Sequence, residues 1–159
     1  MAHHVNKSGY SQLVDRLNRF PQGAPPSPLL NSILKILFTE KEANFVALLP
    51  IKPFTAEKAA AIWKLSPGEA EKILQQLAAR ALLVDIVQND QIEYVLPPPM
   101  AGFFEFSMMR VRSDVDQKAL SELFYQYLNV EEDFVRELFT AGETQLGRVF
   151  VHEPALQEH

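Results

Sequence analysis

Side chains that could support acid–base chemistry lie near the end of the chain. They are the acidic group 131–133, Glu143, Arg148 and His152. Carboxylates at the expected start of a helix are stabilised by the positive end of its dipole, which gives residues 131–133 a sufficient structural role. No nucleophile, base and orienting group stand together at a recognisable spacing. An enzyme is therefore the weakest hypothesis, and it would need a deep polar pocket that joins Glu143, Arg148 and His152.

Metal and cofactor chemistry has little support in the residue types. The sequence has no cysteine, and its four histidines do not follow a zinc-ligand spacing. Its six glycines form neither the GxGxxG nor the GxxxxGKS/T pattern that cradles phosphate groups. We therefore expect no catalytic, cofactor-binding or metal-binding residues within this sequence.

A second set of polar side chains faces outward from the expected reading helix of a helix-turn-helix. They are Lys72, Gln75, Gln76 and Arg80. Glutamine can hydrogen-bond to adenine edges, but affinity for DNA comes mainly from lysine and arginine contacts to phosphates. Between residues 66 and 96 the sequence holds five acidic residues and only two basic ones. This charge disfavours nucleic acid and favours a protein partner.

Capping residues predict the helices that would position this set. Thr39 and Glu42 form a capping box at the start of one helix. Thr55 caps a second helix that runs to about residue 64. Ser66 caps a third, and Pro67 occupies its first position, where a missing amide costs nothing. The turn between the second and third helices is short, as in a helix-turn-helix.

A hairpin completes the predicted domain. Residues 83–88 and 91–96 read as strands, and Asn89-Asp90 between them tolerates turn conformations. We therefore predict a mainly α chain with a small β-hairpin: a winged helix-turn-helix over residues 29–96, followed by a helical C-terminal extension.

The segment before this domain, residues 1–28, predicts a helix and a linker. Apolar residues recur at helical spacing between Tyr10 and Phe20, and Pro21 ends the pattern. Four prolines and a glycine in residues 21–28 predict a stiff, extended linker. Ser27 and Pro28 then form the start of the next helix.

The extension, residues 97–159, begins with Pro97-Pro98-Pro99, which predicts an extended rod. Residues 102–109 fit a buried helix better than a strand. Asp114 or Asp116 is expected to cap the next helix, and Asn129 another. Residues 149–151 form a short strand-like run.

Aromatic and methionine side chains in the extension offer a candidate interface. They are Phe103, Phe104, Phe106, Met108, Met109 and Tyr125. Such residues fill protein cores, and they are also enriched in interface cores. Core packing, a neighbouring domain and a homodimer all remain open from the sequence.

Net charge and hydrophobicity bound the partners further. The net charge is −5, and residues 97–159 hold eleven acidic and five basic residues. The acidic extension disfavours nucleic acid and anionic membranes. No apolar run of about 18 residues is present, and the N-terminus lacks a signal peptide. We expect a cytoplasmic protein without membrane association.

Four further segments have distinctive sequences: residues 22–26 (QGAPP), 47–55 (ALLPIKPFT), 96–106 (LPPPMAGFFEF) and 143–151 (ETQLGRVFV). Together they resemble the N-terminal region of bacterial 4Fe-4S ferredoxin-type proteins. The resemblance implies a winged-helix-like domain that precedes a cysteine-rich region with a 4Fe-4S cluster, in an electron-carrying or redox-linked protein. No cluster ligand carries over, because this sequence has no cysteine. We expect the sequence to stop short of that region.

The residues and the resemblance together favour a non-catalytic interaction or regulatory domain of an iron-sulfur protein, with a protein partner or the downstream domain as its target. The alternative is a redox-linked, DNA-binding transcription regulator. Dimerisation would then have to bring a basic N-terminal segment beside the reading helices. Its basic residues are Lys7, Arg16, Arg19 and Lys35.

Overall fold

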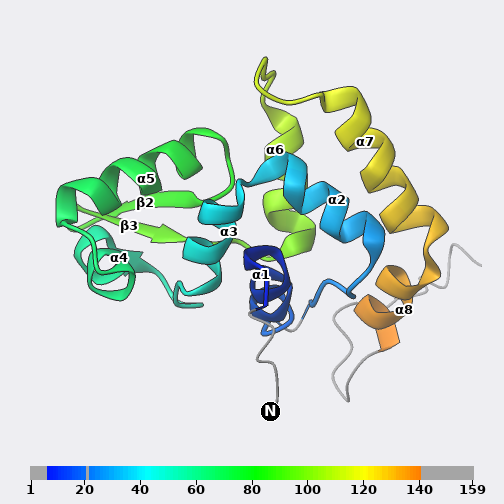
Figure 1. The fold of residues 1–159 in the computed structure, drawn as a ribbon, viewed down its shortest axis with the longest axis horizontal. Coiled ribbons are helices and arrows are strands. Elements are labelled where there is room, and N and C mark those ends of the chain that lie inside the picture. Colours follow the sequence, from blue (N-terminus) through cyan, green and yellow to red (C-terminus); the bar gives the residue numbers. More distant parts are fainter. Residues whose placement is uncertain (1–6, 21, 141–159) are drawn as a thin grey trace, which may run out of the picture.

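A small antiparallel sheet and a larger set of helices make up residues 7–20 and 22–140, the part of the chain described by this computed structural model. The sheet has the order β1-β3-β2, so β3 is its central strand. In Figure 1 the sheet lies with α3, α4 and α5 on one side, and α2 lies with α6, α7 and α8 on the other. The predicted mainly α class with a small hairpin is confirmed.

Local capping explains where most of these helices begin. The first five are α1 (Gly9–Leu17), α2 (Pro28–Leu37), α3 (Glu40–Ala47), α4 (Ala56–Trp63) and α5 (Pro67–Ala79). Each follows a serine or threonine whose side chain accepts a backbone N–H three residues further on. The predicted caps Ser27, Thr39, Thr55 and Ser66 are confirmed.

The segment expected to form the helix-turn-helix consists of α4, a short turn and α5. Lys64 ends α4 in a left-handed conformation with φ of 56°, and α5 begins three residues later. Strands β2 (Val84–Gln88) and β3 (Gln91–Val95) then form the hairpin. Asn89 and Asp90 both have positive φ, as required in a tight two-residue hairpin turn. The hairpin is confirmed, and β1 (Phe54–Thr55) adds a third strand that the sequence pattern did not reveal.

The N-terminal helix is packed onto the domain. Helix α1 packs against α3. Beyond it, the side-chain amide of Asn18 donates to the Ala24 carbonyl at 2.9 Å and accepts from the Ala24 amide at 3.0 Å. Ala24 and Pro25 are buried, so the proline-rich segment expected to act as a linker lies against the body of the protein.

The extension turns sharply after the prolines. The turn η1 (Pro99–Phe103) contains Ala101 with φ of 54°, and α6 (Phe104–Met109) follows it. The extension continues through α7 (Gln117–Tyr125), the π-helical turn η2 (Gln126–Val130) and α8 (Glu132–Thr140). Residues 104–109 are therefore helical, as the sequence favoured.

Two expected caps in the extension have different outcomes. Asp116 caps α7 by accepting the Ala119 amide at 3.0 Å. The prediction for Asn129 is wrong, because this residue lies inside η2 and its amide donates to the Tyr125 carbonyl. The chain keeps its helical hydrogen bonding through residue 130, so no free helix start exists at Asn129.

An aromatic cluster joins the extension to α2. The Phe104 ring lies 4.7 Å from the ring of Phe103 and 4.9 Å from that of Phe124, measured between centroids. Phe103 in turn meets Phe38 after α2 at 6.3 Å. Such contacts make the extension part of the same hydrophobic core as the helical domain.

Candidate functional site

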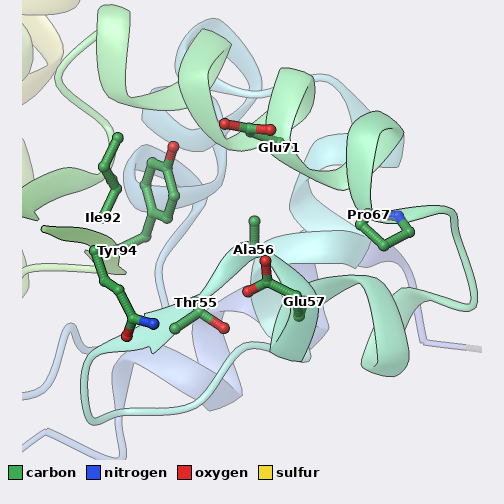
Figure 2. Close-up of a pocket in the computed structure, with 8 residues that line it drawn as sticks. Thr55, Ala56, Glu57, Pro67, Glu71, Ile92 and Tyr94 are labelled. Carbon is green, nitrogen blue, oxygen red and sulfur yellow. The ribbon is translucent and has the colours of Figure 1, made fainter.

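A hollow opens between the start of α4, the start of α5 and the central strand β3. Its volume is about 260 Å³. The residues that line it come from these three elements and from the end of β1: Thr55, Ala56, Glu57, Pro67, Glu71, Gln91, Ile92 and Tyr94. Figure 2 shows Glu71 above the gap, Glu57 below it and Tyr94 beside it. The hollow therefore lies where the first turns of α4 and α5 meet the strand β3.

Helix caps place the two glutamates of the hollow. Thr55 accepts the Lys58 amide at 3.4 Å and starts α4, which puts Glu57 in the first helical turn. Two hydrogen bonds lower the pKa of the Glu57 carboxyl. The larger effect comes from the Thr55 hydroxyl, and the smaller from the backbone amide of Glu57. Glu71 lies in α5 beyond a capping box in which Ser66 and Glu69 bond to each other's backbone amides.

Among the residues that the structure describes, Glu71 has a hydrogen-bond partner at one of its two carboxylate oxygens. The Gln75 side-chain amide donates to Oε1 of Glu71 at 3.2 Å, within the same helix. Both residues are exposed, and Glu71 points to the space above Tyr94 in Figure 2. The second oxygen of Glu71 is thus available to a ligand in the hollow.

Tyr94 is the least exposed polar residue of the hollow. Its relative exposure is 2%, and its ring packs beside Phe54 at 6.5 Å between centroids. Burial raises the pKa of Tyr94, and the negative charges of Glu71 and Asp85 raise it further. Among the residues described, the Tyr94 hydroxyl has no hydrogen-bond partner. The hydroxyl oxygen is not enclosed by protein, so a molecule in the hollow can reach it.

The four candidate DNA-contacting residues lie in two different environments. Lys72, Gln75 and Gln76 are exposed on α5. Arg80 is half-buried and forms an ion pair with Glu42 of α3. It also donates to the Leu37 carbonyl at 3.4 Å, so its guanidinium joins α5 to α2 and α3. Of the two cations predicted to face a partner, Lys72 is exposed and Arg80 is held within the domain.

One cation of the basic N-terminal segment is buried in the core. Arg16 is fully buried, and it donates to the carbonyls of Leu49 at 3.0 Å and Pro50 at 2.7 Å. Burial lowers the pKa of Arg16 to about 10. The expectation that Arg16 adds surface charge for a DNA phosphate is therefore wrong. Its place beside Leu13 and Leu17 on the apolar face of the helix was the signal for burial.

The candidate interface residues of the extension are also divided. Phe103 and Phe104 are buried in the core of this chain, so neither side chain can contact a partner. Phe106 and Met108 are half-buried. Met109 and Tyr125 are exposed, at 78% and 60%. Phe103 and Phe104 belong to the aromatic cluster of the core. Within this set of six residues, Met109 and Tyr125 are the two whose side chains are exposed to a partner.

The β2–β3 hairpin, which was expected to form the wing, carries an apolar surface that the sequence pattern did not single out. Val87 and Ile92 are paired across β2 and β3, and both are exposed, Val87 at 72%. They lie on the same face of the hairpin as Tyr94, because side chains of a strand alternate between its faces. The acidic hollow is therefore continued along the wing by apolar side chains.

Other expected features have a more limited outcome. Glu143, Arg148, His152 and the strand-like run 149–151 lie outside the described residues. Within residues 7–20 and 22–140, no helix is long and apolar enough to cross a bilayer, and no group of three or more His, Asp or Glu residues could hold a metal ion. Comparisons with protein-family models, curated proteins and solved structures find no match to this chain.

Proposed function

We propose that this chain is a non-catalytic protein-interaction domain that binds a positively charged partner through α5, the hollow and the wing. The observation that carries the proposal is the charge of this face. Glu57 and Glu71 line the hollow, whereas Arg80 is paired with Glu42 inside the protein. A DNA-binding face needs several cations for the phosphates, whereas this face has two carboxylates at the hollow and Lys72 on α5.

The exposed wing supports a protein partner over a small ligand alone. Val87 and Ile92 extend the polar hollow with an apolar strip. Protein interfaces combine such apolar centres with charged rims, and complementary charge increases the rate of association. A partner with basic residues around an apolar centre fits both parts of this face.

The resemblance to 4Fe-4S ferredoxin-type proteins supports a context for the domain. We propose that it positions or regulates a cluster-binding region, located either in a downstream part of the same protein or in a partner. The proline-aromatic block 96–106 is the most specific part of that resemblance. The resemblance therefore suggests which region the partner surface belongs to. That this surface is basic is inferred separately, from the carboxylates of the face.

Two titrations test the proposal. A labelled duplex DNA should show no sub-micromolar binding by fluorescence anisotropy, at either end of a range of about 50 to 200 mM salt. A library of displayed peptides, selected on the immobilised full chain, should be enriched in basic sequences that contain apolar residues. Sub-micromolar DNA binding that falls steeply with salt would contradict the proposal, and so would selection of acidic or uncharged peptides.

A further inference from the structure

We propose that the hollow between α4, α5 and β3 binds an arginine side chain of a protein partner. This inference rests on the proposed function, and it adds the chemical group that is recognised and the residues that recognise it. Glu57, Glu71 and Tyr94 supply the polar contacts, and Pro67 and Ile92 supply apolar contacts.

The polar groups come from separate walls of the hollow. In Figure 2 the Glu71 carboxylate, the Glu57 carboxylate and the Tyr94 hydroxyl lie around the same gap. A guanidinium has five N–H donors in one plane, so it can donate to two carboxylates and a hydroxyl at the same time. A lysine ammonium has three donors on a single nitrogen and fits widely separated acceptors less well.

The Tyr94 hydroxyl is a hydrogen-bonding group that faces the hollow and does not belong to the acidic pair. Tyr94 is 2% exposed, yet its hydroxyl has no hydrogen-bond partner among the described residues and lies at the hollow. The hydroxyl oxygen is open to the hollow, where either water or a ligand can bond to it. A donor group that enters the hollow would provide that bond, with the phenol oxygen as acceptor.

The size and the walls of the hollow fit a side chain. Its volume of about 260 Å³ is several times the roughly 30 Å³ that one water molecule occupies in the liquid. Pro67, Ile92 and Ala56 line it beside the carboxylates. Long basic side chains place their methylene groups against such apolar surfaces while the charged end meets its partners.

The cations of this protein leave the hollow open. Within the described part of the chain, neither lysine nor arginine is among its lining residues. Lys58 and Lys72 are close in sequence to Glu57 and Glu71, but both are exposed and neither side chain lines the hollow. The two carboxylates therefore lack a counter-ion among the residues that line the hollow.

Peptide titrations followed by NMR test this inference directly. Acetyl-Gly-Arg-Gly-amide is added to the ¹⁵N-labelled full chain and compared with the lysine peptide and with the citrulline peptide, a neutral isostere of arginine. We expect saturable shifts at Glu57, Glu71 and Tyr94 with the arginine peptide, at a Kd on the order of 1 mM. The lysine peptide should bind more weakly, and the citrulline peptide should cause no saturable shift.

Three variants locate the binding site. Glu71→Gln should weaken binding of the arginine peptide about tenfold, because it removes one charge-assisted contact. Tyr94→Phe removes only the hydroxyl and should weaken binding about threefold. Asp90→Asn is the matched control: it neutralises one acid at the wing tip, outside the hollow, and asparagine tolerates the positive φ of this position. Its Kd should remain within about twofold of the wild-type value.

The outcomes separate this inference from the proposed function. If Asp90→Asn weakens binding as much as Glu71→Gln, the attraction is diffuse and the hollow is not the site, although the protein still selects basic peptides. Equal binding of the citrulline and arginine peptides would also overturn the inference, and so would tighter binding of the lysine peptide. Failure of the proposed function has another signature, since the displayed library would then yield no basic sequences.

Discussion

The two ends of α5 are built in opposite ways. At the C-terminal end, Arg110 donates to the Ala79 carbonyl at 3.0 Å, and Arg112 donates to the Arg80 carbonyl at 3.4 Å. At the N-terminal end, Ser66 caps the helix, and Glu71 borders an open hollow. The first end is tied to the extension by arginines, and the second is open to a partner.

This difference shows which charged side chains stabilise α5 and which remain exposed to a partner. Acids at a helix N-terminus and cations at a C-terminus both stabilise the helix dipole. Arginines that satisfy the last carbonyls of α5 are no longer available to phosphates. The carboxylates near the first turns remain exposed, so the same arrangement that stabilises the helix gives the open end its negative charge.

The largest predicted effect concerns the C-terminal end of α5, which we call the closed end because the extension contacts it. Phe104→Ala removes the centre of the aromatic cluster and should lower the free energy of unfolding by about 3–5 kcal/mol. Urea denaturation measures this change, with Met109→Ala as the exposed control on the same helix. Amide exchange at the end of α5 should also accelerate, because Arg110 and Arg112 follow Phe104 in the extension. If amide exchange at the end of α5 does not change, the aromatic cluster does not hold Arg110 and Arg112 in place, and this prediction is wrong.

The second prediction removes one arginine of the closed end. Arg80→Ala leaves Glu42 half-buried without its partner and should cost about 2 kcal/mol, since the pair is shielded from water but not fully buried. Lys72→Ala, on the exposed side of the same helix, should change the free energy of unfolding by less than about 0.5 kcal/mol. Equal effects of the two substitutions would show that the ion pair contributes nothing beyond the charge of the helix.

The third prediction concerns the open end. Ser66→Ala removes the cap that accepts the Glu69 amide and should cost about 1 kcal/mol. Ser121→Ala serves as a control, because the Ser121 hydroxyl only donates to the Lys118 carbonyl one turn earlier in α7. Thermal and urea denaturation should separate the two variants. A larger loss for Ser121→Ala would contradict the assignment of the cap.

The smallest effect depends on pH. The bond from Arg112 lowers the pKa of Asp114 from its ordinary value of 3.8 to about 2. Because the folded-state pKa is depressed, the contribution of Asp114 to stability is present above pH 3.8 and is lost as the pH falls toward 2. The Tm of Asp114→Asn should therefore be slightly below that of the wild type at about pH 6, and the gap should close on acidification. A constant gap would mean that the carboxylate charge does not hold Arg112.

Short-range signals explain which parts of the fold could be predicted from the sequence. Ser66 and Thr39 act on amides three residues away, so their chemistry is visible in a few letters of sequence. Asn89 and Asp90 likewise encode a turn by their tolerance of positive φ. These signals place the helices and the hairpin without knowledge of the tertiary structure.

Long-range contacts explain what the sequence did not reveal. Arg80 and Glu42 lie 38 residues apart, and no local pattern shows that they pair. The role of Tyr94 depends on how β3 packs below α5, which sequence periodicity leaves open. Asparagine is a residue type that often caps helices. Asn129 nevertheless lies inside η2, because the hydrogen bonds of that turn determine its conformation.

The hydrogen bond from the Tyr127 hydroxyl to the Pro25 carbonyl has a consequence for the order of folding. Its partners are 102 residues apart in sequence. Closing a loop of this length costs about 4 kcal/mol of chain entropy, whereas one hydrogen bond returns only about 1 kcal/mol. The bond can therefore form only after the aromatic cluster has already brought the extension back to α2. We expect the proline-rich segment to be fixed late in refolding, when the phenol of Tyr127 finds its carbonyl.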